Sequence, residues 1–258
     1  MNKEQTTNTR RMATVSLLLF LIALVSVTAA TLAWFSITDN TRVYSMDMEV
    51  TTGASLRFDL DPHGEFTEYR ETLTCDEIFE RIRQEYGYDP WTTAMRPVTT
   101  SDGRRFTLRS GAEQAPDTGA FLKFTLHFMA TEDMVVHLSS ANSKDRLDGT
   151  NISSALEKLP VAMRISFTQG NQTVIFDPGA TNSYQIGENI LVFGLPQADL
   201  MLYNDDNGLF GIKADTDMKL DVCIWMEGTD EACTDDVKNG DFAIRLRFVG
   251  TDADNNPI

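Results

Sequence analysis

The stretch Phe121-Leu-Lys-Phe-Thr-Leu-His-Phe128 alternates apolar and polar side chains along its length. A period of two is typical of a β-strand that buries one face and leaves the other polar. The same pattern recurs along the chain, and many turns but no regular strand–helix alternation separate the runs. We therefore expect a mainly β domain, an antiparallel β-sandwich or jelly roll. The further strands are expected at residues 43–50, 54–60, 134–138, 161–167, 172–176, 189–193, 218–226 and 242–248.

One helix is expected within this β pattern. Thr74-Cys-Asp-Glu77 fits a capping box, and Gly87 provides a stop signal. The apolar residues between them recur at helical spacing and are Cys75, Ile78, Phe79, Ile82 and Tyr86. We expect this helix to cover one end of the sandwich, the alternative being a docking helix for another subunit. A second short helix is expected at Ser153–Leu159, ended by Pro160.

The N-terminus predicts a membrane segment. No charged residue occurs from Met12 to Thr38, and helix over residues 12–35 would measure about 36 Å, enough to cross a bilayer. Lys3, Arg10 and Arg11 precede this segment and Asp39 follows it. The positive-inside rule then places residues 1–11 in the cytoplasm and a domain of residues 39–258 outside the cell. We therefore expect a single-pass protein of the cell membrane.

A cleaved signal peptide is the alternative for the same segment. Its basic start and the small residues at Thr28-Ala29-Ala30 and Thr31-Leu32-Ala33 suit a cleavage site. Its apolar run is longer than is usual for a signal peptide, which favours a retained anchor. Cleavage would release the domain as a secreted protein.

The charge balance bears on partners. The chain holds 22 Lys and Arg against 38 Asp and Glu, which gives a net charge of −16. Nucleic acid is therefore not expected as a partner, because phosphate binding needs a basic surface. Membrane contact is expected through residues 12–35 only.

No catalytic motif is present, and the chain is not expected to be an enzyme. His63, His127 and His137 are too far apart in sequence for a zinc-peptidase helix, and no Gly-x-Ser-x-Gly elbow occurs. We expect His127 and His137, which lie on strand-like runs, to be packed or rim residues instead of ligands. No cofactor and no metal site are predicted.

Calcium is the one metal left open, as a weak extracellular site. Asp59-x-Asp61-x-His63-Gly64 resembles the start of an EF-hand loop, but its twelfth position is Arg70 instead of Glu. Two further oxygen-rich clusters, Asn204–Gly208 and Asp252–Asn256, also have the composition of ordinary turns.

The three cysteines allow one disulfide. Cys223 and Cys233 are the favoured pair in an oxidised exported domain, because a short loop separates them. The alternatives are a bridge from Cys75 to either of them, or three free thiols.

The membrane junction Thr31-Leu-Ala-Trp-Phe-Ser36 resembles that of the TasA/camelysin group of Gram-positive bacteria. The segments Ile224–Cys233 and Gly240–Phe248 look like the C-terminal end of proteins with this layout. Members of the group are secreted or surface-bound, and some are fibre subunits of the biofilm matrix. The resemblance implies a jelly-roll-like sandwich and a dedicated signal peptidase, while no metal motif of the camelysin type carries over to this chain.

Three functions follow from these observations. The first is a non-enzymatic structural or adhesion protein of the cell surface or matrix. The second is a module that binds a surface glycan or protein through Asp89–Gly119, a polar region expected to be a long loop or embedded hairpin. The third is a hydrolase whose site the sequence does not reveal.

Self-assembly is expected, if it occurs, through the strand at Thr38–Val50. The spacing of Val43 and Met46 breaks the alternation there and predicts a β-bulge. Released by cleavage, this strand would be an arm able to complete the sheet of a neighbouring copy. The alternative is that it is the first strand of a monomer.

Overall fold

The structure is a computed structural model that describes residues 15–23, 41–51, 54–140, 148–186, 188–196 and 201–258. The chain divides into two units, Met1–Asp39 and Asn40–Ile258. In the first unit, residues 15–23 are described; they form a helix with exposed side chains. Among the residues placed in the structure, no helix has both the length and the apolar character needed to cross a bilayer. The rest of the segment predicted at 12–35 lies outside the described residues.

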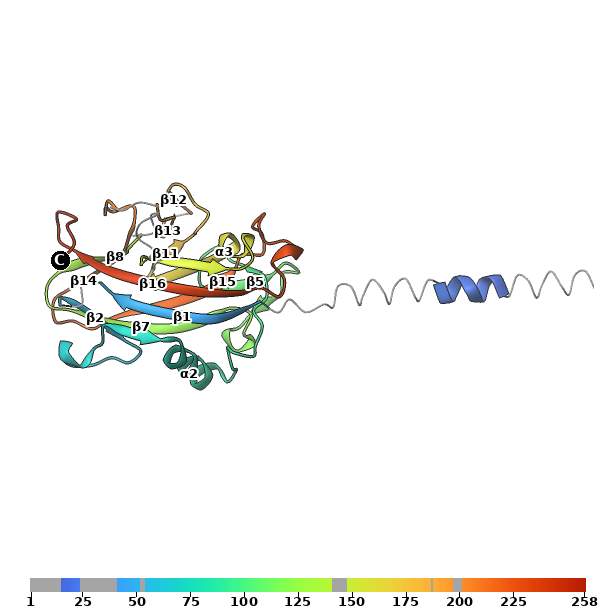
Figure 1. Ribbon diagram of the computed structural model, residues 1–258, viewed down its shortest axis with the longest axis horizontal. Helices are drawn as coiled ribbons and strands as arrows, with labels where there is room; N and C mark the ends of the chain where they lie inside the picture. Colours follow the sequence, from blue (N-terminus) through green and yellow to red (C-terminus); the bar gives the residue numbers. More distant parts are fainter. Residues whose placement is uncertain (1–14, 24–40, 52–53, 141–147, 187, 197–200) are drawn as a thin grey trace, which may run out of the picture. The chain divides into compact units, whose positions relative to one another are not determined.

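The second unit is mainly β, as predicted, and contains two large sheets (Figure 1). A six-stranded sheet has the order β14 (Gly208–Ile212), β8 (Met134–Leu138), β16 (Asp241–Thr251), β1 (Arg42–Val50) and β3 (Thr72–Thr74), and β9 (Asn151–Ser154) also pairs with β16. A seven-stranded sheet has the order β12 (Tyr184–Gln185), β13 (Ile190–Phe193), β11 (Gln172–Phe176), β10 (Met163–Gln169), β15 (Met218–Met226), β7 (Leu122–Ala130) and β2 (Leu56–Asp59).

The sheets are mixed, so the expectation of a purely antiparallel fold is wrong. β1 pairs with β16 in parallel, and β11 pairs with β13 in parallel. The alternation of apolar residues indicates which face of a strand is buried, but it does not indicate the direction of the neighbouring strand. Parallel neighbours need a long crossover. For β1 and β16 almost the whole domain is that crossover.

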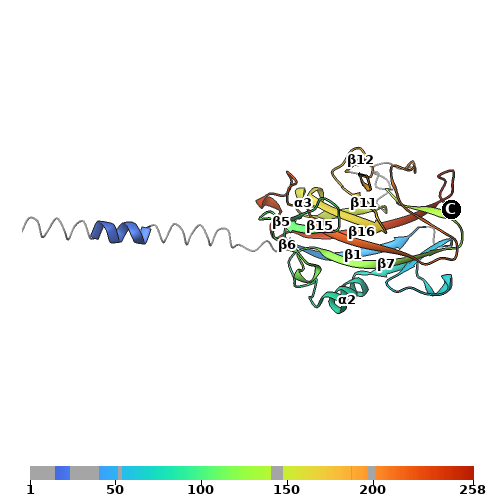
Figure 2. The same cartoon turned by 180° about the vertical axis from the view of Figure 1, so that it is seen from behind.

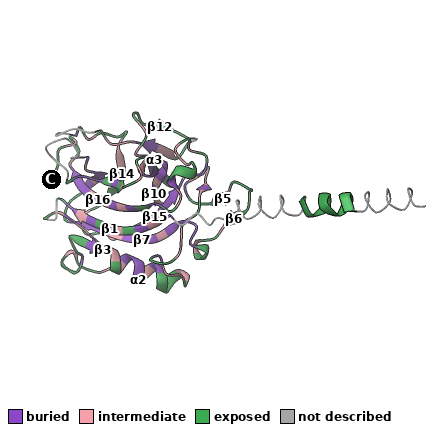
Figure 3. Cartoon of the chain, turned by 45° about the vertical axis from the view of Figure 1, so that its right-hand side comes forward, coloured by how far each residue is buried: buried purple, intermediate pink, exposed green. Residues whose placement is uncertain are grey.

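The two large sheets pack face to face around one core. Along β7, Leu122, Phe124, Leu126 and Phe128 are buried, in agreement with the predicted alternation. Phe248 of β16 contacts aromatic rings of the opposite sheet, with centroids 5.8 Å from Phe58 and 5.2 Å from Phe128. Figure 3 shows the buried residues concentrated on these facing strands.

The predicted helix is confirmed as α2 (Cys75–Tyr86). The Glu77 carboxylate accepts hydrogen bonds from the backbone N–H and hydroxyl of Thr74, and Gly87 ends the helix in the left-handed conformation with φ of 76°. Its buried residues are Ile78, Phe79 and Ile82. The helix contacts β7, β3 and β1, which belong to both large sheets, so it covers the core along that side (Figure 2).

The second predicted helix is displaced. Residues 151–154 form β9, and α3 spans Lys158–Ala162. Pro160 therefore lies inside the helix instead of ending it. This position tolerates proline because N–H groups of the first helical turn have no intrahelical acceptor. As a result, residues 161 and 162 are helical where a strand was predicted.

Asp89–Gly119 contains a small sheet of β4 (Val98–Thr99), β5 (Phe106–Leu108) and β6 (Glu113–Gln114), so it is an embedded hairpin extended by one strand. Val98, Phe106 and Phe121 pack with Cys223 and Trp225 of β15 in a second apolar cluster. This region therefore covers part of the outward face of the seven-stranded sheet. The described part of the domain also contains three short 3₁₀ helices: η1 (Phe66–Glu68), η2 (Pro116–Thr118) and η3 (Asp235–Val237).

Candidate functional site

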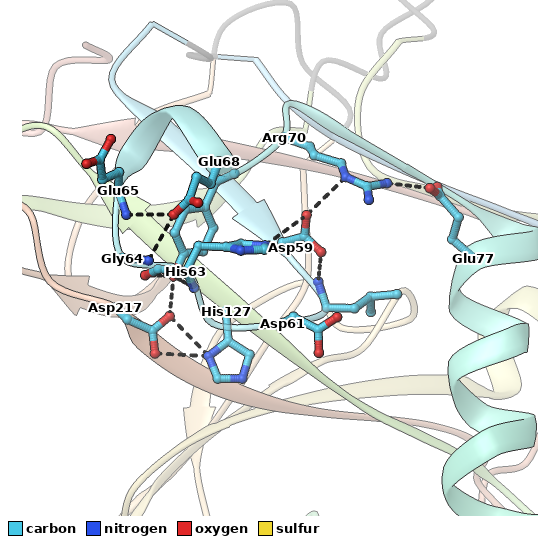
Figure 4. Close-up of polar contacts among 12 residues, drawn as sticks. Asp59, Asp61, His63, Gly64, Glu65, Glu68, Arg70, Glu77, His127 and Asp217 are labelled. Atoms are coloured by element: carbon cyan, nitrogen blue, oxygen red, sulfur yellow. Dashed lines mark hydrogen bonds and ion pairs between the residues drawn. The ribbon is translucent and has the colours of Figure 1, made fainter.

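A polar network surrounds the loop that leaves β2 (Figure 4). Asp59, the last residue of β2, is 4% exposed; it accepts a hydrogen bond from the Leu60 N–H at 2.6 Å and pairs with Arg70 Nε at 3.0 Å. Arg70 also pairs with Glu77 of α2 and exchanges two backbone hydrogen bonds with Phe58. The two ends of the loop of residues 60–69 are therefore held together by backbone hydrogen bonds and by an ion pair.

Through Tyr69 the same loop is attached to Asp217, which directly precedes β15 and also contacts His127 of β7. Tyr69 Oη accepts a hydrogen bond from the His63 N–H at 2.9 Å and donates one to Asp217 Oδ1 at 2.7 Å. His127 Nδ1 lies 3.0 Å from both oxygens of Asp217. Burial, together with the bond to Asp217, raises the pKa of Tyr69 to about 12, so its hydroxyl remains a donor at neutral pH.

The segment that resembles an EF-hand start lies within this network. Asp59 pairs with Arg70, and Asp61 pairs with Arg81 at 2.5 Å. A calcium ion would have to displace these cations, since its ligands must be free carboxylate oxygens. In the described part of the chain, no group of three or more His, Cys, Asp or Glu side chains is arranged to hold a metal ion.

The two other oxygen-rich clusters form turns. Asn207 Oδ1 accepts from the Asn204 N–H at 2.9 Å and lies 3.0 Å from His137 Nδ1. Asp252 Oδ1 accepts from the N–H groups of Asp254 and Asn256, each at 2.9 Å. Their side chains are thus used to satisfy backbone donors, the usual role of Asx residues in turns.

His137 is a packed residue, as predicted. Its ring is fully buried, with Nε2 3.0 Å from Thr251 Oγ1. Burial lowers its pKa despite hydrogen bonds to Asn207. A neutral imidazole at this position joins β8 to the end of β16.

Cys75, Cys223 and Cys233 form no disulfide in the described part of the chain. Cys223 belongs to the outer apolar cluster with Trp225, whereas Cys233 packs against the main core. Burial raises the pKa of Cys223 to about 12. The bridge between Cys223 and Cys233 in an oxidised protein stays a prediction.

The strand expected to mediate assembly is β1, described from residue 41 onward. It lies inside its sheet between β16 and β3, with Val43, Met46, Met48 and Val50 at most 4% exposed. The predicted bulge is confirmed, because the register against β16 shifts between Val43 and Ser45. In this arrangement the chain completes its own sheet.

One concavity lies on the outward face of the seven-stranded sheet and is lined by three cations: Arg104, Lys123 and Lys219. Sequence reasoning did not identify Lys123 and Lys219, whereas Arg104 lies within Asp89–Gly119, the region considered for glycan or protein binding. Lys123 and Lys219 occupy polar positions of two alternating strands, which is a readable signal. Their proximity depends on the pairing of β7 with β15, which alternation alone does not specify. Chemically, such a group of N–H donors suits the recognition of an anion.

Comparison of the chain with known proteins finds no matching family model, no similar curated protein and no similar solved structure.

Proposed function

We propose that the protein is a non-enzymatic structural or adhesion protein of the bacterial cell surface or extracellular matrix. Residues 12–35 anchor it as a single-pass segment with residues 1–11 in the cytoplasm, or are removed when the domain is secreted. The exported domain of residues 39–258 is a jelly-roll-like sandwich. The charge bias of Lys3, Arg10 and Arg11 against Asp39 supports this topology.

The observation that carries the proposal is the position of β1. Thr41 is already buried and hydrogen-bonded within the domain, and only residues 36–40 separate it from Phe35. Five residues span at most about 18 Å. A retained anchor would therefore hold the domain close to the external surface of the cell membrane, as expected for a surface protein.

Assembly through β1 is the proposed route to a matrix fibre. A neighbouring copy could supply this strand only after the chain's own β1 leaves the sheet, because both of its sides are paired. Exchange would then bury the same four apolar side chains in another copy and retain the register against β16.

The topology is tested with protease added to intact cells or spheroplasts. The domain should be digested while a cytoplasmic marker protein stays intact, and mass spectrometry of the native protein should identify an intact or trimmed N-terminus. In permeabilised cells, the control, the protease should digest both the domain and the cytoplasmic marker protein. Complete protection of the domain behind an intact membrane would contradict the proposal.

A further inference from the structure

The basic concavity has a volume of about 340 Å³ and lies where the cover formed by residues 98–121 ends. Along β15, Leu220 and Val222 face the main core, whereas Lys219, Asp221 and Cys223 face outward. Cys223 is covered by the small sheet, and the face opens to solvent toward Lys219. The concavity therefore lies at the boundary between the part of the seven-stranded sheet that the small sheet covers and the part that is exposed to solvent.

Strand pairing brings the charged groups together across this face. Lys123 of β7 lies directly opposite Cys223, and Asp221 lies opposite Thr125 on one side and Thr168 of β10 on the other. Asp221 accepts a hydrogen bond from Thr125 Oγ1 at 2.9 Å and lies 3.4 Å from Lys219 Nζ. Three cations and one carboxylate thus line the concavity, and the carboxylate already has two partners.

Arg104 is held in place by the loop that carries it. Gly103 approaches the sheet so closely that its carbonyl accepts a hydrogen bond from Ser166 Oγ at 2.8 Å. Asp102 Oδ1 accepts from the Arg104 and Arg105 N–H groups at 2.9 and 2.8 Å. Arg104 Nε donates to Thr173 Oγ1 at 3.0 Å, which leaves the two Nη groups for a ligand.

Two of the three cations have no carboxylate partner in the described part of the chain, whereas Lys219 lies 3.4 Å from Asp221. Neither Arg104 nor Lys123 forms an ion pair with any carboxylate that the structure places. The thiol of Cys223 is neutral, since burial raises its pKa to about 12. The lining therefore has three positive charges and one negative charge, in a chain whose net charge is −16.

We propose that this concavity binds an oxyanion, the carboxylate or phosphate group of a small ligand, through Arg104, Lys123 and Lys219. Arginine offers paired N–H donors that match such a group, and lysine adds compact charges. The volume lies at the lower end of the range for small-molecule sites, which suits a single sugar or a ligand of similar size. Thr168, also in the lining, offers a hydroxyl to the body of the ligand. This inference goes beyond the proposed surface role and does not depend on it.

The test is calorimetric titration of the full chain, purified in detergent at low ionic strength, with inorganic phosphate, glucuronate and neutral glucose. Phosphate, glucuronate or both should bind and glucose should not. Binding of only one of the two anions identifies whether the concavity recognises a phosphate or a carboxylate group. Added salt should weaken the binding, because the attraction lies near the surface.

Variants locate the binding. Arg104→Gln and Lys123→Gln should each weaken it about tenfold, the loss expected for one charge-assisted hydrogen bond. Asp221→Asn should strengthen it, since it removes the only carboxylate of the lining. The matched control is Lys213→Gln, an exposed lysine that pairs with Asp133 beside the other sheet, and it should leave the affinity unchanged.

Thermal unfolding of each variant separates lost binding from lost folding. The proposal is overturned if folded wild-type protein gives no heat of binding with either anion at concentrations well above the millimolar range. It is also overturned if both Arg104→Gln and Lys123→Gln bind as tightly as wild type.

Discussion

The outward face of β7 carries a polar group near each end, and the two ends have different surroundings. Near the C-terminal end His127 lies against Asp217, within a network in which Asp59, Arg70 and Glu77 are also paired. Near the N-terminal end Lys123 has no ion-pair partner among the described carboxylates.

The difference separates charges that maintain the fold from charges open to a ligand. In the network, loss of one side chain leaves another charged or polar group without its partner, which costs folding free energy. In the concavity, the cations contribute little to the folding free energy. Acidic residues outnumber basic ones 38 to 22, so most cations could find a carboxylate partner. Cations without such a partner in the concavity therefore indicate a ligand site more strongly than the paired charges of the network do.

Asp59→Ala should produce a large effect, a loss of about 2 kcal/mol in the free energy of unfolding. The substitution removes the partner of Arg70 and the acceptor of the buried Leu60 N–H. Because Arg70 is half exposed, solvent screening reduces the part of this loss that comes from the Asp59–Arg70 ion pair. Chemical denaturation of the full chain measures the change.

The control is Asp236→Ala, because Asp236 and its partner Lys158 are both exposed. Its free energy of unfolding should stay close to that of wild type. Equal losses in the two variants would show that the network contributes no more than a surface ion pair.

Gly103→Ala should cost about 2 kcal/mol, because it combines backbone strain with a steric clash. Gly103 has a φ of 66°, and a Cβ there would lie 2.8 Å from Thr173 Cγ2. Gly111→Ala is the matched control: its φ is 84°, but a Cβ meets nothing within 4 Å. It should cost about 1 kcal/mol, the backbone share alone. Similar losses would show that the close approach of this loop to the sheet is not required.

The sequence predicted most of the elements of the core. Residues 134–138, 172–176 and 218–226 are strands with the expected bounds, and α2 begins and ends as its capping signals indicate. These predictions depend on local patterns, since alternation and capping act within a few residues. Among the strands that were missed, β3 and β12 are three and two residues long and show too few alternations to be detected. The missed strands β9 and β14 are four and five residues long.

The sites could be predicted less well because they depend on tertiary register. The calcium-like spacing from Asp59 to Gly64 is real in sequence, but Arg70 and Arg81 occupy its carboxylates after the chain folds back. The basic concavity unites residues from β7, β15 and the loop before β5. A slip of one residue in the β7–β15 pairing would turn Lys123 into the core. No local pattern specifies this pairing.

Lys123→Gln should produce the smallest effect on stability, less than about 0.5 kcal/mol, because it breaks no ion pair with the described residues. The corresponding change in the network, Arg70→Gln, should cost about 1 kcal/mol, since it leaves the buried Asp59 without its cation. Denaturation of the two variants under the same conditions gives the comparison directly. A larger loss for Lys123→Gln would assign this lysine to the fold and reverse the contrast between the two ends of β7. With the expected small loss, weakened oxyanion binding in the same variant reports the removal of a ligand contact, because the structure that presents Arg104 and Lys219 is unchanged.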